Sequence, residues 1–337
     1  MEVQPEKQNI DKLFSNTTFY IDFYQRQYKW TDEPVKRLLD DILYKFNKEY
    51  KKHKDSKLPL EHIISKYSWY YLNTYVTNLV DGKLYVVDGQ QRLTTLTLIL
   101  IKLKHLSRHF NSQLELWIGQ KIVGLSGFNT DFWMNHEKHK VAMQGLLDGI
   151  SSDKINTESG LTAQNMVNNY TIISSRLDNE LTSIHHFESF VFYFMYRLVL
   201  INLNVEQTEV PMVFEVINDR GVRLKPYEIL KGKLLGQISK EELDSLKLNE
   251  LWEEQVSSIN TFKEDEIDQF FTYFLKAKFA GTIGEGRRYD NDYHRVIFSE
   301  NKLSLDHNPR KVMDFLQKDF KYYTDLYRKI LENYKSY

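Results

Sequence analysis

The feature that most constrains the fold lies between residues 70 and 103, where two strand-like runs meet at a tight turn and lead into a helical pattern. Both runs are rich in Tyr, Val and Thr, and Asp81-Gly82 between them supplies the positive φ angles of a hairpin turn. The second run ends at Asp88-Gly89. Beyond it, leucines recur at helical spacing, at Leu93, Leu96, Leu100 and Leu103. We therefore expect an α+β fold.

Helical patterns dominate the rest of the chain, and two further stretches predict strands. The aromatic-rich residues 17–30 predict a short strand that runs into a loop, and residues 198–205 predict a strand after a mainly helical region from about 111 to 197. Downstream we expect a helix, a polar turn around Asn218 to Gly221, and a helix that starts near Pro226. From about residue 240 the pattern is helical, with a glycine-rich break at 280–288.

The composition excludes several classes of protein. The formal net charge of −1 gives no global positive field that would draw the chain to nucleic acid, although a local basic patch would suffice. Because the chain has no cysteine, disulfides, thiolate metal sites and cysteine nucleophiles are excluded. Lys102 and Arg197 interrupt the most apolar windows, which are too short for a membrane span. The acidic N-terminus lacks the features of a signal peptide, so we expect a soluble, cytoplasmic protein.

The polar stretch VVDGQQRLTT (86–95), at the strand-to-helix junction, is the first candidate site. A glycine followed by a helix N-terminus suits an anion, because the first N–H groups are unpaired and the dipole end is positive. Arg92 adds a forked charge that fits phosphate oxygens. Thr94 and Thr95 add hydroxyl donors, and Gln90 and Gln91 can orient a water or a polar ligand.

Asp88 leaves more than one interpretation of this stretch open. Beside a phosphate, its carboxylate would bind a metal, hold Arg92 or accept a proton. The structural alternative has about equal weight on local chemistry alone. In that alternative Asp88 or Gln90 caps the helix, and Arg92 pairs with a neighbouring acid.

Two further polar boxes accompany this stretch. In YQRQYKW (24–30), aromatic rings could stack on bases while Arg26 and Lys29 hold phosphates; the structural alternative places Tyr28 and Trp30 in the core. In Asn218-Asp219-Arg220-Gly221, turn chemistry explains three of the four residues and leaves Arg220 as the candidate ligand. No G-x-x-x-x-G-K-[ST] motif or Ser-His-Asp arrangement is present, and no histidines have convincing metal-ligand spacing, so we expect no resident metal site.

Taken in order, three boxes resemble the N-terminal domain of GmrSD-type, modification-dependent restriction proteins, in the ParB-like (ParB/sulfiredoxin) superfamily. They are FYQRQYKW (23–30), VVDGQQRLTTL (86–96) and FEVINDRGVRLKPYEILKGKL (214–234), which we call the first, second and third box. The resemblance spans residues 10 to about 236. It implies a small mixed α/β nucleotide-binding domain elaborated with helices, in which the second box binds and hydrolyses a nucleoside triphosphate.

Carried over by position, the resemblance implies a set of site residues. The catalytic ones are Asp88, Gln90, Gln91 and Arg92. Those that bind the nucleotide are Gln25, Arg26, Tyr28, Gly89, Thr94, Thr95, Asn218 and Arg220. The resemblance also implies that the domain couples hydrolysis to the sensing of modified foreign DNA, while a C-terminal HNH-type nuclease domain cuts.

The chain departs from this pattern in three places. In the family, the first box often opens with Ile-Pro, and the corresponding residues just before Phe23 in this chain are Ile21-Asp22. Before the last helix of the third box, Lys225 occupies the position where a capping Ser or Thr is usual. No HNH motif follows residue 236. We therefore expect a ParB-like domain over residues 1–236, with a helical insertion at about 111–197, and a helical domain over 237–337. The chain is then a fragment of a longer protein or does not cut DNA by itself.

The leading hypothesis is an NTP-hydrolysing sensor domain of an anti-phage restriction system. Arg92, Arg26 and the helix N-terminus would hold the phosphates of GTP or ATP; Gln90 or Gln91 would position water; Asp88 would act as base or hold a Mg²⁺ shared with the phosphates. The partner would be modified DNA, with a nuclease domain or subunit outside this chain. The alternatives are a DNA-binding module without catalysis and a metal-dependent nuclease of the ParB-like class.

Overall fold

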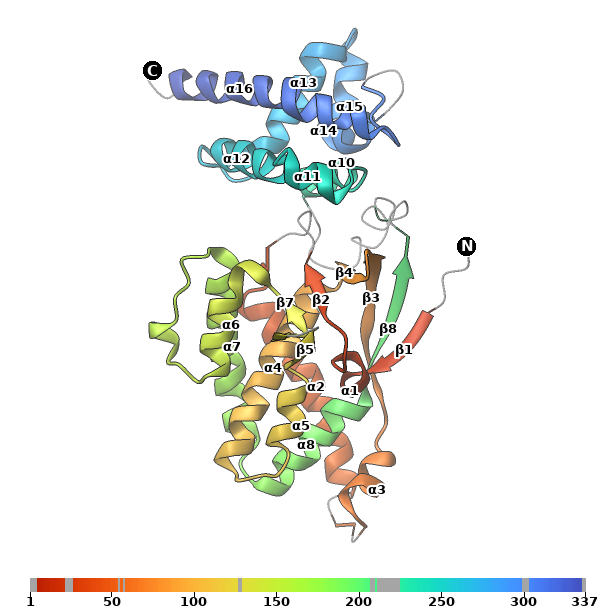
Figure 1. Cartoon of the computed structure of the whole chain (residues 1–337), viewed down its shortest axis with the longest axis vertical. Coiled ribbons are helices and arrows are strands. Elements are labelled where there is room, and N and C mark those ends of the chain that lie inside the picture. Colours follow the sequence, from red (N-terminus) through yellow and green to blue (C-terminus); the bar gives the residue numbers. More distant parts are fainter. Residues whose placement is uncertain are drawn as a thin grey trace. The chain divides into compact units, whose positions relative to one another are not determined.

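The computed structural model describes residues 5–21, 27–53, 55–56, 58–126, 129–206, 210, 225–298 and 303–334. They form two compact units, the first ending at Val205 and the second beginning at Glu206 (Figure 1). The first unit mixes strands and helices and the second is helical, which confirms the predicted fold class. Among the described residues, no helix is both long enough and apolar enough to cross a membrane.

A mixed six-stranded sheet organises the first unit. Its strand order is β1 (Pro5–Asn9), β8 (Leu198–Val205), β3 (Tyr70–Val80), β4 (Lys83–Asp88), β2 (Phe19–Ile21) and β7 (Met134–Asn135). Strands β3 and β4 form the predicted hairpin, with positive φ at Asp81 and Gly82. Strands β2, β4 and β7 are mutually parallel, whereas β3 and β8 run the other way.

The helices of the first unit gather on one side of this sheet (Figure 1). They are α1 (Ile10–Leu13), α2 (Asp32–His53), α3 (Leu60–Ser65), α4 (Gln90–His109), α5 (Glu115–Gln120), α6 (Lys140–Leu147), α7 (Leu161–Glu180) and α8 (Ile184–Arg197). Strands β5 (Val123–Ser126) and β6 (Asn129–Phe132) pair antiparallel in a separate two-stranded sheet. Strands β5, β6 and β7 fall inside the region predicted to be helical, so that prediction is incomplete there.

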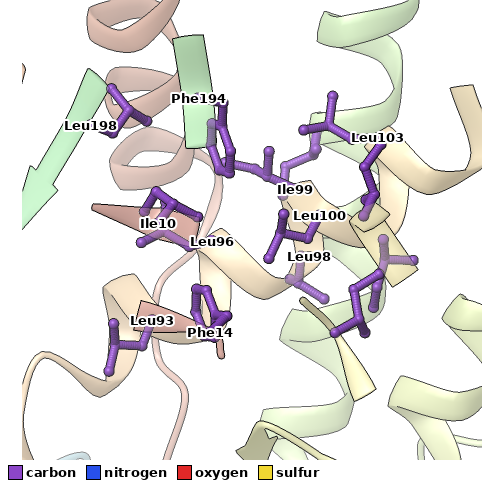
Figure 2. Close-up of a cluster of buried hydrophobic side chains, with 14 of the residues drawn as sticks. Ile10, Phe14, Leu93, Leu96, Leu98, Ile99, Leu100, Leu103, Phe194 and Leu198 are labelled. Atoms are coloured by element: carbon purple, nitrogen blue, oxygen red, sulfur yellow. The ribbon is translucent and has the colours of Figure 1, made fainter. Parts of the chain in front are cut away.

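Helix α4 is the central element of the core. Its leucines have the predicted helical spacing, and the helix is buried nearly all round because α5, α7 and the sheet surround it. Figure 2 shows its apolar side chains meeting those of α1 and α8. A helix held on all sides is a rigid support, so the polar residues of its first turn have fixed positions.

The second unit has its own core. Its helices are α10 (Pro226–Leu235), α11 (Lys240–Ser245), α12 (Leu248–Asn260), α13 (Glu266–Phe279), α14 (Ile283–Val296), α15 (Pro309–Asp314) and α16 (Lys321–Tyr334), with a π-helical turn over Phe315–Phe320. Trp252 stacks on Phe320, with the ring centroids 4.8 Å apart, at the centre of an aromatic cluster. Helix α10 begins at Pro226, as predicted.

The predicted glycine-rich break at 280–288 is wrong for its second half. Helix α14 already begins at Ile283 and includes Gly284 and Gly286. The Thr282 side chain accepts a hydrogen bond from the Glu285 N–H, and the Glu285 carboxylate accepts one from the Gly281 N–H at 2.8 Å. This capping arrangement starts the helix early and offsets the low helix propensity of the glycines.

Candidate functional site

The second box contains a turn, at Gly89, that only glycine can occupy. Strand β4 ends at Asp88, and Gly89 takes a left-handed conformation (φ +100°, ψ −1°) as the N-cap of α4. A Cβ at this position would lie 2.7 Å from the Cβ of Tyr75 on strand β3. Both the positive φ and the close approach exclude a larger side chain, so the chain enters α4 directly above the sheet.

The register of the sheet brings the first box to the same edge. Strand β2 runs parallel to β4, and its last residue, Ile21, pairs with Val86, two positions before Asp88. The chain therefore leaves β2 beside the point where β4 leads into α4. Residues 22–26, which include the predicted site residues Gln25 and Arg26, lie outside the described residues.

Gln91 joins the two boxes directly. Its side-chain Oε1 accepts hydrogen bonds from the backbone N–H groups of Lys29, at 2.8 Å, and Trp30, at 3.0 Å. Its Nε2 donates to the backbone carbonyl of Gln27 at 3.0 Å. The side chain is buried, so these three bonds are shielded from water and hold residues 27–30 against the first turn of α4.

Tyr28 is a core residue at the centre of this contact. Its hydroxyl lies 2.8 Å from Oγ1 of Thr95, whose own proton is donated to the Gln91 carbonyl, so Tyr28 is the donor. Asn169 donates to the same hydroxyl at 2.9 Å and to the Trp30 carbonyl at 2.7 Å. Burial raises the pKa of Tyr28 to about 12, so its hydroxyl remains protonated at neutral pH.

Helix α7 lies in the region predicted to be mainly helical, but its contribution to this network was not foreseen from the sequence. Besides Asn169, its Thr162 accepts from the Tyr28 N–H at 3.0 Å, and its Asn165 donates to the Tyr28 carbonyl at 2.7 Å. The three polar residues are spaced by three and four positions, which places them on one face of a helix. That spacing was the available signal.

Thr94 also faces the interior. Its hydroxyl lies 2.8 Å from Nε2 of His136, which follows strand β7. Burial lowers the pKa of His136 to about 3, so the imidazole is neutral at physiological pH. The structure thus places Thr94 and Thr95 in buried contacts behind the first turn of α4, and His136 is a second residue that sequence reasoning missed.

Arg92 and Asp88 lie close enough to interact electrostatically. Burial lowers the pKa of the half-buried Arg92 guanidinium, while Asp88, Tyr71 and Tyr70 act in the opposite direction. Within the described part of the chain, no carboxylate comes within the 4.0 Å of a salt bridge to Arg92. Burial has removed much of the water around the guanidinium, and Asp88 supports its charge.

Gln90 carries a buried polar atom that needs a donor. The residue is 4% exposed, and its Oε1 has no hydrogen-bond partner in the described structure. Because a buried amide oxygen without a partner costs free energy, such atoms in native proteins usually meet an ordered water or a ligand.

The N-terminus of α4 carries no side-chain cap. In the structural alternative Asp88 or Gln90 caps the helix and Arg92 pairs with an acid; the N-cap residue itself is Gly89, which has no side chain, and Asp88 acts electrostatically on Arg92. The first N–H groups of α4 therefore retain the capacity to bind an anion. The third-box residues Asn218 and Arg220 lie outside the described residues. Where the structure describes the chain, no group of three or more metal-binding side chains is found.

The first unit is thus a mixed α/β domain in which Gly89 leads the chain from strand β4 into the buried helix α4. The family model of the GmrSD restriction endonuclease N-terminal domain matches residues 10–235, about two thirds of the chain. The chain therefore belongs to this family and contains a restriction-system domain. No curated protein matches the sequence.

Proposed function

We propose that the chain binds and hydrolyses a nucleoside triphosphate as the sensor domain of a modification-dependent restriction system. The observation that carries the proposal is the first turn of α4, where the helix is uncapped and Arg92 is half-buried without a carboxylate within 4.0 Å among the described residues. This combination suits a phosphate group. The family membership supports the restriction setting.

The geometry of the turn supports the proposed phosphate binding. Gly89 has no side chain, so phosphate oxygens can approach the N–H groups that open α4. Arg92, one turn into the helix, adds a forked pair of donors. Because α4 is buried nearly all round, these groups do not need to reorganise when charge develops on the phosphate.

The residues on either side of Gly89 supply the chemistry. The orphan Oε1 of Gln90 accepts a hydrogen bond from the attacking water. The water oxygen bonds to the γ-phosphorus, the bond from that phosphorus to the β–γ bridging oxygen breaks, and the water proton passes to the Asp88 carboxylate. The products are a nucleoside diphosphate and phosphate.

In this proposal the two glutamines have different roles. Three hydrogen bonds from Gln91 hold residues 27–30, so we assign Gln91 a positioning role and the water to Gln90. Tyr28, Thr94 and Thr95 support the turn from behind through their buried hydroxyls. In this proposal they shape the nucleotide site without touching the phosphates.

The described residues do not form a resident site for Mg²⁺, because Asp88 is a single carboxylate and no group of metal-binding side chains surrounds it. Mg²⁺ prefers to share its ligands between one or two carboxylates and substrate phosphates. We propose that it arrives with the nucleotide, as part of a Mg–GTP or Mg–ATP substrate.

The biological setting is likewise a proposal. We infer that the hydrolysis step reports the recognition of modified phage DNA, and that a nuclease domain or subunit outside this chain makes the cut. Foreign DNA enters the cytoplasm, so an anti-phage sensor of this kind acts there. The restriction-system family supports DNA as the partner.

Measuring NTP turnover by the purified chain tests the proposal. Asp88→Asn and Arg92→Ala should each lower turnover by about 100-fold or more, the range for loss of a general base or of a transition-state charge contact. Asp148→Asn, at the exposed end of α6, and Arg108→Ala, in the last turn of α4, are matched controls that should keep full turnover.

Turnover that survives the double substitution Asp88→Asn, Arg92→Ala would refute the mechanism. Salt-sensitive DNA binding without any turnover would instead favour the non-catalytic DNA-binding module. Mg²⁺-dependent nicking that is lost in Asp88→Asn would favour the nuclease.

A further inference from the structure

An exposed aromatic pair stands at the start of strand β3. Trp69 immediately precedes the strand and is 59% exposed, and Tyr71 within it is 42% exposed. Exposed aromatic side chains are scarce in the described part of the first unit, where the other two are Tyr44 and Tyr196. Lys45 lies 5.9 Å from the ring of Tyr44 and 5.8 Å from the ring of Tyr70, which packs against the core.

A lysine lies over one ring of this pair. Nζ of Lys7, on strand β1, lies 5.3 Å from the centroid of the Trp69 ring. Arg92 also acts electrostatically on Tyr71 and Tyr70. Two carboxylates oppose this charge, since Asp41 acts on Tyr70 and Asp88 acts on Arg92.

The arrangement leaves ring surface available for a ligand. Trp69 retains its 59% exposure with Lys7 over one face of the ring, so the lysine does not cover it. Trp69 immediately precedes the strand and Tyr71 is its second residue, so the two exposed rings belong to one short segment. Two exposed rings in one segment, with a lysine over one of them, suit the bases and phosphates of an extended nucleic-acid strand.

We propose that Trp69 and Tyr71, with Lys7 over the Trp69 ring, are a stacking platform for unpaired bases of a DNA strand. Each ring stacks on a base, and Lys7 contacts an adjacent phosphate. Duplex DNA would present only its backbone to this platform, so an unpaired strand or a flipped base is the preferred form. The proposal rests on the DNA-sensing part of the proposed function and is independent of nucleotide hydrolysis.

Fluorescence anisotropy of a labelled 20-nucleotide oligo-dT with the full chain, in the absence of nucleotide, tests the platform. Trp69→Ala and Tyr71→Ala should each weaken binding by about 10- to 100-fold, within the range of base–aromatic stacking. Tyr196→Ala is the matched control, because Tyr196 is also 42% exposed but lies on α8. Lys7→Ala should reduce the salt dependence by about 0.7 in the slope of log affinity against log salt.

Intrinsic fluorescence gives a second readout that a folding defect would not imitate. Trp69 is the most exposed of the five tryptophans, since Trp30 and Trp117 are half-buried and Trp133 and Trp252 are buried. Oligo-dT should quench the wild-type fluorescence. Trp69→Phe, which keeps an aromatic ring, should retain binding within about 3-fold and lose the quenching.

Equal binding by Trp69→Ala, Tyr71→Ala and Tyr196→Ala would overturn the proposal. Tighter binding of the matching 20-base-pair duplex than of oligo-dT would also overturn it. Loss of NTP turnover in Arg92→Ala with DNA binding intact would support the platform as a separate element. Absence of turnover in the wild-type chain would refute the proposed hydrolysis and leave the DNA-binding measurement interpretable.

Discussion

Replacing Gly89 with alanine would place a methyl group between the start of α4 and strand β3. The new Cβ would lie 2.7 Å from the Cβ of Tyr75 and 3.4 Å from its Cα. Neither atom can move without moving the backbone of β3, which lies inside the sheet between β8 and β4. Relief would therefore require α4 or the strand to shift.

Two costs add at this position. A left-handed conformation costs a residue with a Cβ about 1–2 kcal/mol, and an overpacked site costs about 1–3 kcal/mol. We expect Gly89→Ala to lower the free energy of unfolding of the first unit by about 2–5 kcal/mol, a large fraction of the stability of a typical domain. Gly82→Ala is the matched control, because Gly82 has φ +74° and no atom within 4 Å of an added Cβ. Gly82→Ala should incur only the first cost, that of the left-handed conformation.

Urea denaturation of the full chain, followed by tryptophan fluorescence, measures the difference. Four of the five tryptophans lie in the first unit, so the signal reports mainly on that unit. The Gly89→Ala transition should occur at clearly lower urea than that of Gly82→Ala, with the gap set by contact with Tyr75. Equal midpoints for the two variants would refute the close approach as the reason for glycine.

Three further predictions concern the buried polar groups. Gln91→Ala should lower the stability of the first unit by about 2–4 kcal/mol, because two backbone N–H groups lose their acceptor, and hydrogen exchange at Lys29 and Trp30 should accelerate. The pKa of Asp268 is raised by burial to about 6, so the folded second unit retains a proton that the unfolded chain releases near pH 4. Its stability should therefore fall by about 2 kcal/mol from pH 4 to pH 7, and Asp268→Asn should remove this dependence in hydrogen-exchange mass spectrometry of that unit. His136 gives stability the opposite dependence on pH. Because its pKa in the folded chain is about 3, the unfolded chain gains a proton below about pH 6.5 and the folded chain does not. The first unit should be about 2 kcal/mol less stable at pH 5 than at pH 7, and a flat profile that matches His136→Gln would contradict the buried neutral imidazole.

The local elements of the fold could be predicted because their causes are local. The Asp81-Gly82 turn, the glycine before α4 and the proline that opens α10 each act within a few residues. Strand β1 was missed because PEKQN has no apolar alternation. It forms as an edge strand because β8 offers it a hydrogen-bonding partner.

The candidate site was predictable only in part, because several of its contacts join residues far apart in the sequence. Gly89 and the anion-ready turn follow from the second box alone. The engagement of Gln91 depends on residues more than sixty positions away, and an amide side chain could as easily orient a water. The contribution of α7 is more distant still, since Asn165 and Asn169 reach Tyr28 across more than 130 positions. Pairings of this kind become visible only when the chain is folded.

The hydrogen bonds between α7 and Tyr28 limit how far this domain could be shortened. A shortened version without α7 would remove Thr162, Asn165 and Asn169 together. The backbone of Tyr28 and the carbonyl of Trp30 would then lose their hydrogen-bond partners in the interior, so such a version should be less stable than the whole unit. An engineered or natural shortening of this region would have to replace those three polar contacts on another element.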